Sequence, residues 1–235
     1  MPLFLILLFL TIAIILIVAD QKARSARRRA LAEFAARQLW SFDPEDDANF
    51  AELHERFALF QKGSSKTISL TLRGTAETRF GRLAVQAGDY RYTTGNRKHR
   101  HTCRLSYVLA TLPFSLPPET HLLIRGEHVG DTLTALLGFD DIDFESEEFS
   151  RQFFVKSGDR KFAYAVIHPR MMDYLLRSPC GPLEICGSEI LLHGTGEPIW
   201  SVAEIAAAVD WLVAFVELWP DYLVNGSTGE TAGRA

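Results

Sequence analysis

The chain has 235 residues, of which 47% are hydrophobic and 23% are charged, and its formal net charge is -4. This composition excludes a disordered, a collagenous or a disulfide-scaffold protein, and it allows one soluble domain of ordinary size. The chain has three cysteines, Cys103, Cys180 and Cys186. An odd number cannot form a complete set of intramolecular disulfides, so we expect free thiols in a reducing compartment.

An uncharged apolar segment lies near the beginning of the chain, from Leu3 to Ala19. As a helix it is about 25 Å long, close to the thickness of a thin hydrocarbon core. A cleaved signal peptide is the alternative, but that class of segment carries a basic residue before the apolar run and a small-residue cleavage pattern after it. The sequence has neither, so we predict a transmembrane anchor at residues 1–20.

Five cations follow the apolar segment with no acidic residue among them: Lys22, Arg24, Arg27, Arg28 and Arg29. A positively charged flank resists translocation, so it is expected to remain in the cytoplasm while the N-terminus lies outside. We therefore predict a single-pass protein of the cell's inner (plasma) membrane, with a cytoplasmic C-terminal domain and with membrane lipids around the N-terminal helix. Specific recognition of anionic lipid is a second interpretation of the same cations.

Residues 21–62 are predicted to form a juxtamembrane helix that continues the anchor, and then a second helix. In residues 25–40 the apolar residues recur at helical spacing, and they are Ala30, Leu31, Phe34, Ala35 and Leu39. Asp43 and Pro44 have the residue types of a helix start, and the second helix is expected to end near Lys62. Its predicted packing face consists of Phe50, Leu53, Phe57 and Phe60.

Residues 63–222 are predicted to form an α+β domain with a largely antiparallel sheet and packed helices. In residues 67–73 apolar and polar side chains alternate, which places Ile68, Leu70 and Leu72 on one face of a strand. Further β-rich segments bounded by Gly and Pro predict an antiparallel meander, and they are residues 83–92, 102–112 and 121–125. A short helix is expected at residues 131–137, before an acidic stretch at 140–148.

In the second half of this domain the residues that begin and end helices and strands are easier to recognise. Strands are predicted at 152–156 and 161–167, a helix from Pro169, and a hairpin of 183–186 with 189–193. Ser201 and Glu204 form a capping box for a final helix that Pro220 ends. Asp210 near its middle makes a second membrane span costly, so this helix is expected to pack on the sheet. Residues 223–235 are predicted to be a disordered tail.

Two motifs carry a resemblance to a known family. They are the Tyr-x-Tyr-Thr-Thr-Gly run at 90–95 with the basic residues after it, and Asp-Ile-Asp-Phe-Glu at 141–145 with Glu-Phe-Ser-Arg at 148–151. Together with Leu112-Pro113 and Glu127 they resemble a family of bacterial membrane-anchored proteins of unknown function. The turn lacks the second glycine of the family. The resemblance covers residues 57–176 and implies an anchored soluble domain, but it assigns no ligand and no catalytic residue.

A basic hairpin supplies the first candidate site. Arg97, Lys98 and Arg100 lie between two predicted strands, and arginine side chains present a planar fork to oxyanions. Such a loop could bind a phosphate or an acidic partner, whereas solvated hairpin charge is the simpler interpretation. No phosphate-binding glycine loop accompanies it.

Metal and catalytic signatures are weak. His99, His101 and Cys103 would share one face of a strand and have zinc-ligand types, but the fourth ligand is missing. The acidic residues of 140–148 do not have the spacing of a calcium-binding loop. We expect them to form the solvent-exposed face of a short strand. Cys180 and Cys186 lack a zinc or redox spacing. No nucleophile elbow or zinc-protease helix occurs. We therefore expect no metal, no cofactor and no enzymatic activity.

The sequence thus leaves two principal hypotheses for function. The first is a non-enzymatic interaction or scaffold domain near the membrane, with an unknown membrane or cytosolic protein as partner. The alternative is a membrane-proximal domain that binds an anionic small molecule or a lipid headgroup through Arg97, Lys98 and Arg100. A hydrolase assembled from distant residues stays open as a third class. Nucleic acid is not expected as a partner, because no basic stripe interleaved with aromatic residues occurs.

Overall fold

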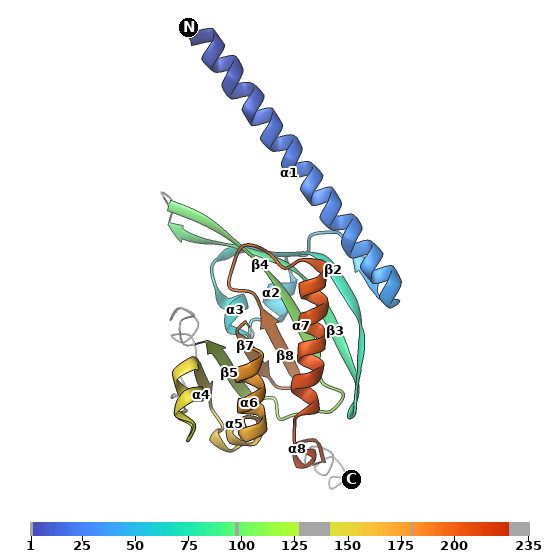
Figure 1. The fold of residues 1–235 in the computed structure, drawn as a ribbon, viewed down its shortest axis with the longest axis vertical. Helices are drawn as coiled ribbons and strands as arrows, with labels where there is room; N and C mark the ends of the chain where they lie inside the picture. Colours follow the sequence, from blue (N-terminus) through green and yellow to red (C-terminus); the bar gives the residue numbers. More distant parts are fainter. Residues whose placement is uncertain (1, 97–98, 127–141, 180, 226–235) are drawn as a thin grey trace.

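The structure is a computed structural model that describes residues 2–96, 99–126, 142–179 and 181–225. The side chains of residues 2–8, 13, 20 and 225 are outside that description. The described chain is an α+β protein with one large antiparallel sheet, as predicted. A long N-terminal helix projects away from it (Figure 1).

The projecting helix is α1, Pro2–Gln38. It is continuous, so the predicted juxtamembrane helix does extend the apolar segment. Near its C-terminus Leu31, Phe34 and Ala35 are buried against the domain, whereas Leu39 is 94% exposed. Leu39 adopts a left-handed backbone with φ of 56° just after the helix ends, which turns its side chain away from the predicted packing face.

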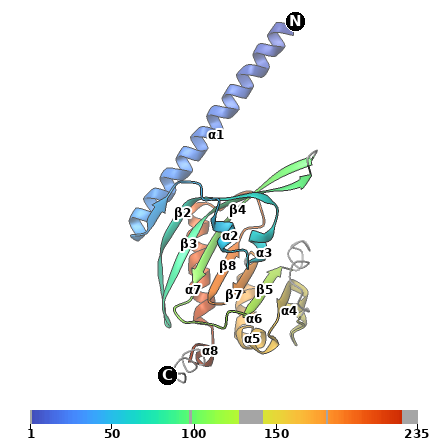
Figure 2. The ribbon, with the colours of Figure 1, turned by 180° about the vertical axis from the view of Figure 1, so that it is seen from behind.

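The N-terminal part of α1 makes no packed layer with the domain (Figures 1 and 2). The described apolar side chains there are exposed, including Phe9, Ile15 and Leu16. Within the described residues no helix is both long enough and apolar enough to cross a membrane. Much of the predicted anchor at residues 1–20 has side chains that lie outside the described residues, so the anchor stays a prediction.

The sheet has eight strands in the order β1-β2-β3-β4-β8-β7-β5-β6, and each strand is antiparallel to its neighbours. The strands are β1 Ser41–Asp43, β2 Ser64–Thr78, β3 Gly81–Asn96, β4 His99–Thr111, β5 His121–Gly126, β6 Phe153–Ser157, β7 Leu183–Cys186 and β8 Glu189–His193. The predicted meander is confirmed for β2, β3 and β4, and the predicted hairpin is confirmed as β7 and β8. The hairpin inserts between β4 and β5, so β5 does not continue the meander.

A β-bulge in β2 reverses the face on which its apolar residues lie. The register shifts between Ser69, opposite Asp89, and Leu72, opposite Ala87, so that β2 has one extra residue there. Gly88 lies beneath the bulge, where an added Cβ would stand 3.0 Å from the Ser69 carbonyl oxygen. The single apolar face predicted for this strand is therefore wrong.

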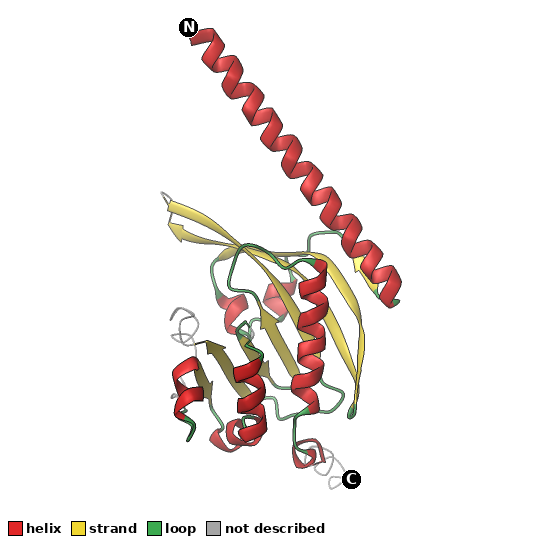
Figure 3. Ribbon diagram, in the orientation of Figure 1, coloured by secondary structure: helices red, strands yellow, loops and turns green. Residues whose placement is uncertain are grey.

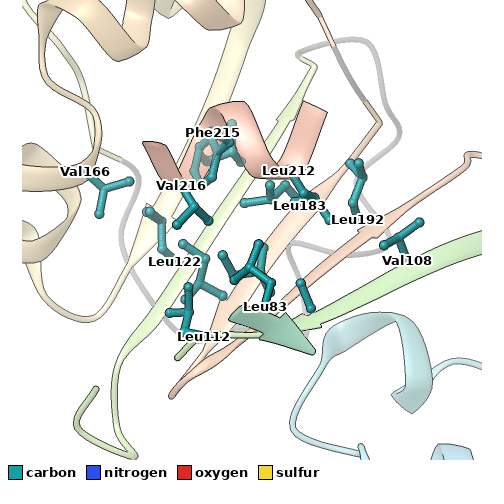
Figure 4. Packing of buried hydrophobic residues seen from close by; sticks show 14 of the residues in the cluster. Leu83, Val108, Leu112, Leu122, Val166, Leu183, Leu192, Leu212, Phe215 and Val216 are labelled. Carbon is teal, nitrogen blue, oxygen red and sulfur yellow. The ribbon is translucent and has the colours of Figure 1, made fainter. Parts of the chain in front are cut away.

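Helices cover both faces of the sheet (Figure 3). The longest of them after α1 is α7, Val202–Glu217, and its predicted capping box of Ser201 and Glu204 is present. It packs on the sheet, as predicted, and contributes Leu212, Phe215 and Val216 to the larger core (Figure 4). The same face carries α5 Arg160–Val166 and α6 Pro169–Arg177, which begins at the predicted proline. Two further short helices are α4 Glu147–Gln152 and α8 Asp221–Asn225.

The opposite face, seen from behind in Figure 2, is covered by α2 Phe50–Leu53 and α3 Ala58–Gln61. These two short helices replace the single helix predicted from Pro44 to Lys62. Asp47 causes part of the difference, because its carboxylate accepts hydrogen bonds from the backbone N–H groups of Asn49 and Phe50 and starts a helix later than predicted.

Two other predicted elements differ. The strand predicted at 161–167 is instead occupied by the helix α5, Arg160–Val166, because the Asp159 side chain accepts hydrogen bonds from the N–H groups of Lys161 and Phe162 and caps a helix. The predicted tail at 223–235 is helical as far as Asn225, and residues 226–235 lie outside the described residues. The predicted helix at 131–137 lies outside them as well.

His193 on β8 gives the core a pH-sensitive residue. Burial lowers the pKa of His193 from 6.5 to about 4, because a buried imidazolium would lose its hydration. The unfolded chain therefore binds more protons between these pH values, and stability falls as the pH falls through this window. We expect a loss of about 2 kcal/mol from pH 7 to pH 5. Urea unfolding at both pH values measures it.

The control is His193→Asn, whose amide can replace the donor that lies 2.7 Å from the Gly194 carbonyl oxygen. This variant should lose much of the pH dependence whatever its stability at pH 7. An equal pH dependence in both proteins would contradict the assignment to His193.

Candidate anion-binding site

Polar residues stand opposite one another on one face of β2, β3 and β4. Arg91 on β3 lies directly opposite Arg104 on β4 and opposite Thr67 on β2. Because side chains alternate along a strand, Asp89 and its partner Ser106 point to the same face as these arginines. Like charges placed directly opposite each other destabilise a sheet. The Arg91–Arg104 pair therefore favours an anion on this face.

The middle of α1 lies over these residues and closes a pocket of about 370 Å³. The charged residues that line the pocket are Arg24, Arg27, Arg28, Asp46, Asp89, Arg91 and Arg104. Five arginines against two aspartates give the described lining an excess of three positive charges. A second hollow of about 470 Å³ shares Thr67, Arg91 and Arg104, and it adds Thr93, Thr102 and one acid, Glu197.

Arg27 holds the helix against the sheet. Its Nε and Nη2 donate to the two Asp89 carboxylate oxygens at 2.8 and 2.6 Å, and its Nη1 donates to the Trp200 carbonyl oxygen at 2.7 Å. Asp89 also accepts a hydrogen bond from Ser106 at 2.9 Å, and the Ser106 hydroxyl oxygen accepts the Trp200 N–H. One bidentate ion pair thus joins α1, β3, β4 and the segment before α7.

Arg28, Arg91 and Arg104 are the more available arginines of the pocket. Arg91 lies 3.5 Å from Asp46, and both side chains are about half exposed, so this ion pair contributes little to stability. Arg28 and Arg104 form no ion pair with any residue that the structure describes, and both are exposed. Guanidinium groups are suited to phosphate and carboxylate oxygens, which they bind in pairs of parallel hydrogen bonds.

The predicted site residues are only partly brought together. Of the membrane-flanking cations, Arg24, Arg27 and Arg28 line the pocket, whereas Lys22 and Arg29 do not. That all five flank a membrane stays a prediction, and the structure adds that Arg27 pairs with Asp89.

The predicted hairpin site stays a prediction, because Arg97 and Lys98 lie outside the described residues. Arg100 is exposed near the end of the β3–β4 ribbon, opposite Gly95 and away from the pocket lining.

Sequence reasoning missed Arg91 and Arg104. A signal was present, because Asp89, Arg91 and Thr93 alternate along one predicted strand, and Thr102, Arg104 and Ser106 alternate along the next. Only the register of the β3–β4 hairpin shows that the residues of the first set lie directly opposite those of the second.

The weaker metal candidates do not assemble either. His99, His101 and Cys103 alternate along β4, but they do not form a group of metal-ligating atoms within the described part of the chain. Asp140 and Asp141 lie outside the described residues. The rest of that acidic stretch is not a strand, although Ile142 and Phe144 are buried. The group that does assemble consists of His121, Glu184 and Cys186, which the spacing of Cys180 and Cys186 in the sequence did not indicate.

The fold and the pocket define this chain as an α+β protein with a helical N-terminal arm and an arginine-lined pocket at the base of the arm. No protein-family model, no curated protein and no solved structure matches it. The resemblance to a membrane-anchored bacterial family stays a prediction.

Proposed function

We propose that this protein is a membrane-anchored binding domain for a phosphate-bearing anion, which it holds between α1 and the β2–β3–β4 face. The observation that carries the proposal is the direct opposition of Arg91 and Arg104 beneath the arginines of α1. The excess positive charge of the described lining favours an anion over a neutral or a cationic ligand in this pocket.

The anchor is part of the same proposal. Exposed apolar side chains continue along α1 beyond the pocket, from Phe9 to Val18. A helix with apolar residues exposed on its described faces gains free energy by entering hydrocarbon. Arg24 and Arg28 follow this segment, so that the pocket would lie at headgroup level on the cytoplasmic side of a bacterial inner membrane. Two sources of the anion are then accessible, a lipid headgroup and a soluble phosphorylated molecule.

Binding is tested with the full-length protein in two arms. Thermal unfolding in detergent with inorganic pyrophosphate measures the soluble arm, since a ligand that binds the native state raises the melting temperature. Sedimentation with nanodiscs of phosphatidylcholine, with and without phosphatidylglycerol, measures the lipid arm. We expect stabilisation by pyrophosphate, or association with nanodiscs that increases when phosphatidylglycerol is present, and this increase is what counts as binding in the lipid arm.

The decisive variant is Arg28→Ala combined with Arg104→Ala, because neither residue has an ion-pair partner among the described residues. Each lost charge-assisted contact should weaken binding by about tenfold. The matched control is Arg29→Ala combined with Arg100→Ala, which removes two exposed arginines from the same two elements outside the pocket. No binding in either arm, or an equal loss in the control, would refute the proposal and return weight to a protein-interaction domain.

A further inference from the structure

A second polar cluster lies beneath α3 and shares no residue with the arginine pocket. His121 on β5 is directly opposite Cys186 on β7, and Glu184 is on the same face of β7 two residues earlier. One ligand atom from each of these three side chains lies within 4.8 Å of the other two. The neighbouring strands hold all three at fixed spacing, so the cluster does not depend on a loop.

The three side chains are largely buried. The Glu184 side chain is 1% exposed, the His121 side chain is 11% exposed, and Cys186 is 3% exposed. The His121 Nε2 atom lies 2.7 Å from Glu184 Oε1, and the Cys186 thiol lies 3.7 Å from the same oxygen. Buried charged groups are ordinarily paired or bound to metal ions. A carboxylate, an imidazole and a thiol at one point are the ligand types that zinc accepts.

The surroundings of the cluster orient its members. The backbone N–H of Ala58 lies 3.0 and 2.9 Å from the two Glu184 oxygens, which fixes the plane of the carboxylate. Outer hydrogen bonds such as these hold the ligands of a metal in position. The Cys186 thiol donates to the Arg56 carbonyl oxygen at 3.5 Å, and this hydrogen bond ends when a metal displaces the thiol proton. The remaining exposure of the imidazole supplies a route of entry from solvent.

We propose that His121 Nε2, a Glu184 carboxylate oxygen and Cys186 Sγ form a site for Zn²⁺ or a similar borderline divalent cation. Three protein ligands leave a fourth position of a tetrahedron for water. The 2.7 Å separation of Nε2 and Oε1 is that of a hydrogen bond, so the two atoms must move apart slightly to admit the ion.

The charge balance is simple. Binding replaces the Cys186 thiol proton and any proton between His121 and Glu184, and these protons go to solvent. The carboxylate and the thiolate then neutralise the divalent ion. In the absence of metal the same cluster is a hydrogen-bonded acid–imidazole pair beside a neutral thiol. The experiment must distinguish this metal-free pair from a metal site.

The test uses full-length protein stripped with a chelator and titrated with Co²⁺, a spectroscopic substitute for zinc. We expect one equivalent to produce a thiolate-to-cobalt charge-transfer band in the near ultraviolet, and added Zn²⁺ to remove it. The wild-type titration is decisive by itself. No thiolate band at one equivalent overturns the proposal, whether or not any variant folds.

Variants assign the ligands. Cys186→Ser should lose the band, whereas the matched control Cys103→Ser, which removes the partly exposed cysteine of β4, should keep it. Glu184→Gln should weaken Co²⁺ binding by about tenfold or more. A band that persists in Cys186→Ser would overturn the assignment. Neither the pyrophosphate nor the nanodisc result bears on this titration, so the two proposals can fail separately.

Discussion

Replacing Phe60 with Ala is expected to lower the free energy of unfolding by about 4 kcal/mol. Phe60 is 0% exposed, and its ring contacts Tyr90 at a centroid distance of 5.0 Å and Phe50 at 5.5 Å, both edge to face. Truncation removes apolar contact area, leaves a cavity between α3 and the sheet, and breaks the aromatic contacts. Urea unfolding of the detergent-solubilised protein, followed by circular dichroism, measures the change.

Leu53→Ala is the matched control for Phe60→Ala. Helical periodicity in the sequence places Leu53 on the same packing face as Phe60, but the structure leaves it 77% exposed at the end of α2. We therefore expect a change of about 0.5 kcal/mol or less for Leu53→Ala. Similar losses for the two variants would mean that residues 45–62 form the single amphipathic helix that the periodicity indicates, and not two short helices.

Replacing Arg27 with Ala is expected to lower the free energy of unfolding by about 3 kcal/mol. The Arg27 and Asp89 side chains are only 16% and 14% exposed. The variant therefore leaves a largely buried carboxylate with Ser106 as its remaining side-chain donor, and it also frees the Trp200 carbonyl oxygen. Because the ion pair connects α1 to the sheet, hydrogen exchange should also increase along the C-terminal part of α1. Urea unfolding gives the energy and mass spectrometry gives the exchange.

Two variants separate this ion pair from general charge effects. Arg29→Ala removes an exposed cation from the same helix and should change stability by about 0.5 kcal/mol or less. The double variant of Arg27→Ala with Asp89→Ala should lose less than the sum of the two single losses, because neither charge is then left alone. Additive losses would show that Arg27 and Asp89 do not stabilise the fold through each other.

Elements with strong local signals were predictable. The α7 helix begins at Ser201 and Glu204, which satisfy each other's backbone N–H groups, and nothing distant is needed to start it. The β7–β8 hairpin likewise has β-rich strands on both sides of Gly187, whose φ is 55°. In both cases the deciding interactions join residues only a few positions apart.

Elements that hydrophobic periodicity alone does not settle were mispredicted. Residues 161–167 are short and apolar, so periodicity alone does not distinguish a strand from a helix, and the cap by Asp159 decides. The face of Leu72 was predicted wrongly because an extra residue in β2 is invisible in the alternation of the sequence, while the opposing Gly88 is what accommodates it.

The candidate sites were also predictable only in part: the sequence shows the residue types, and the tertiary structure shows which of them meet. Residue types at Arg24, Arg27 and Arg28 were visible as a positive cluster, but their meeting with Arg91 and Arg104 depends on how α1 docks against β3 and β4. The contact between His121 and Glu184 spans 63 positions of sequence and exists because the β7–β8 hairpin inserts beside β5.

By itself the sequence determined the α+β class, three strands of the antiparallel meander, the capped final helix and the position of the apolar and basic segments at the start of the chain. These follow from hydrophobic period, turn residues and caps, which act over a few residues. Tertiary structure alone decided the strand order, the faces on which side chains lie, and which charged or ligating groups meet. Those features depend on how surfaces that are distant in sequence pack against each other. A local sequence pattern shows that a surface is apolar or charged, but it does not show which other segment covers that surface.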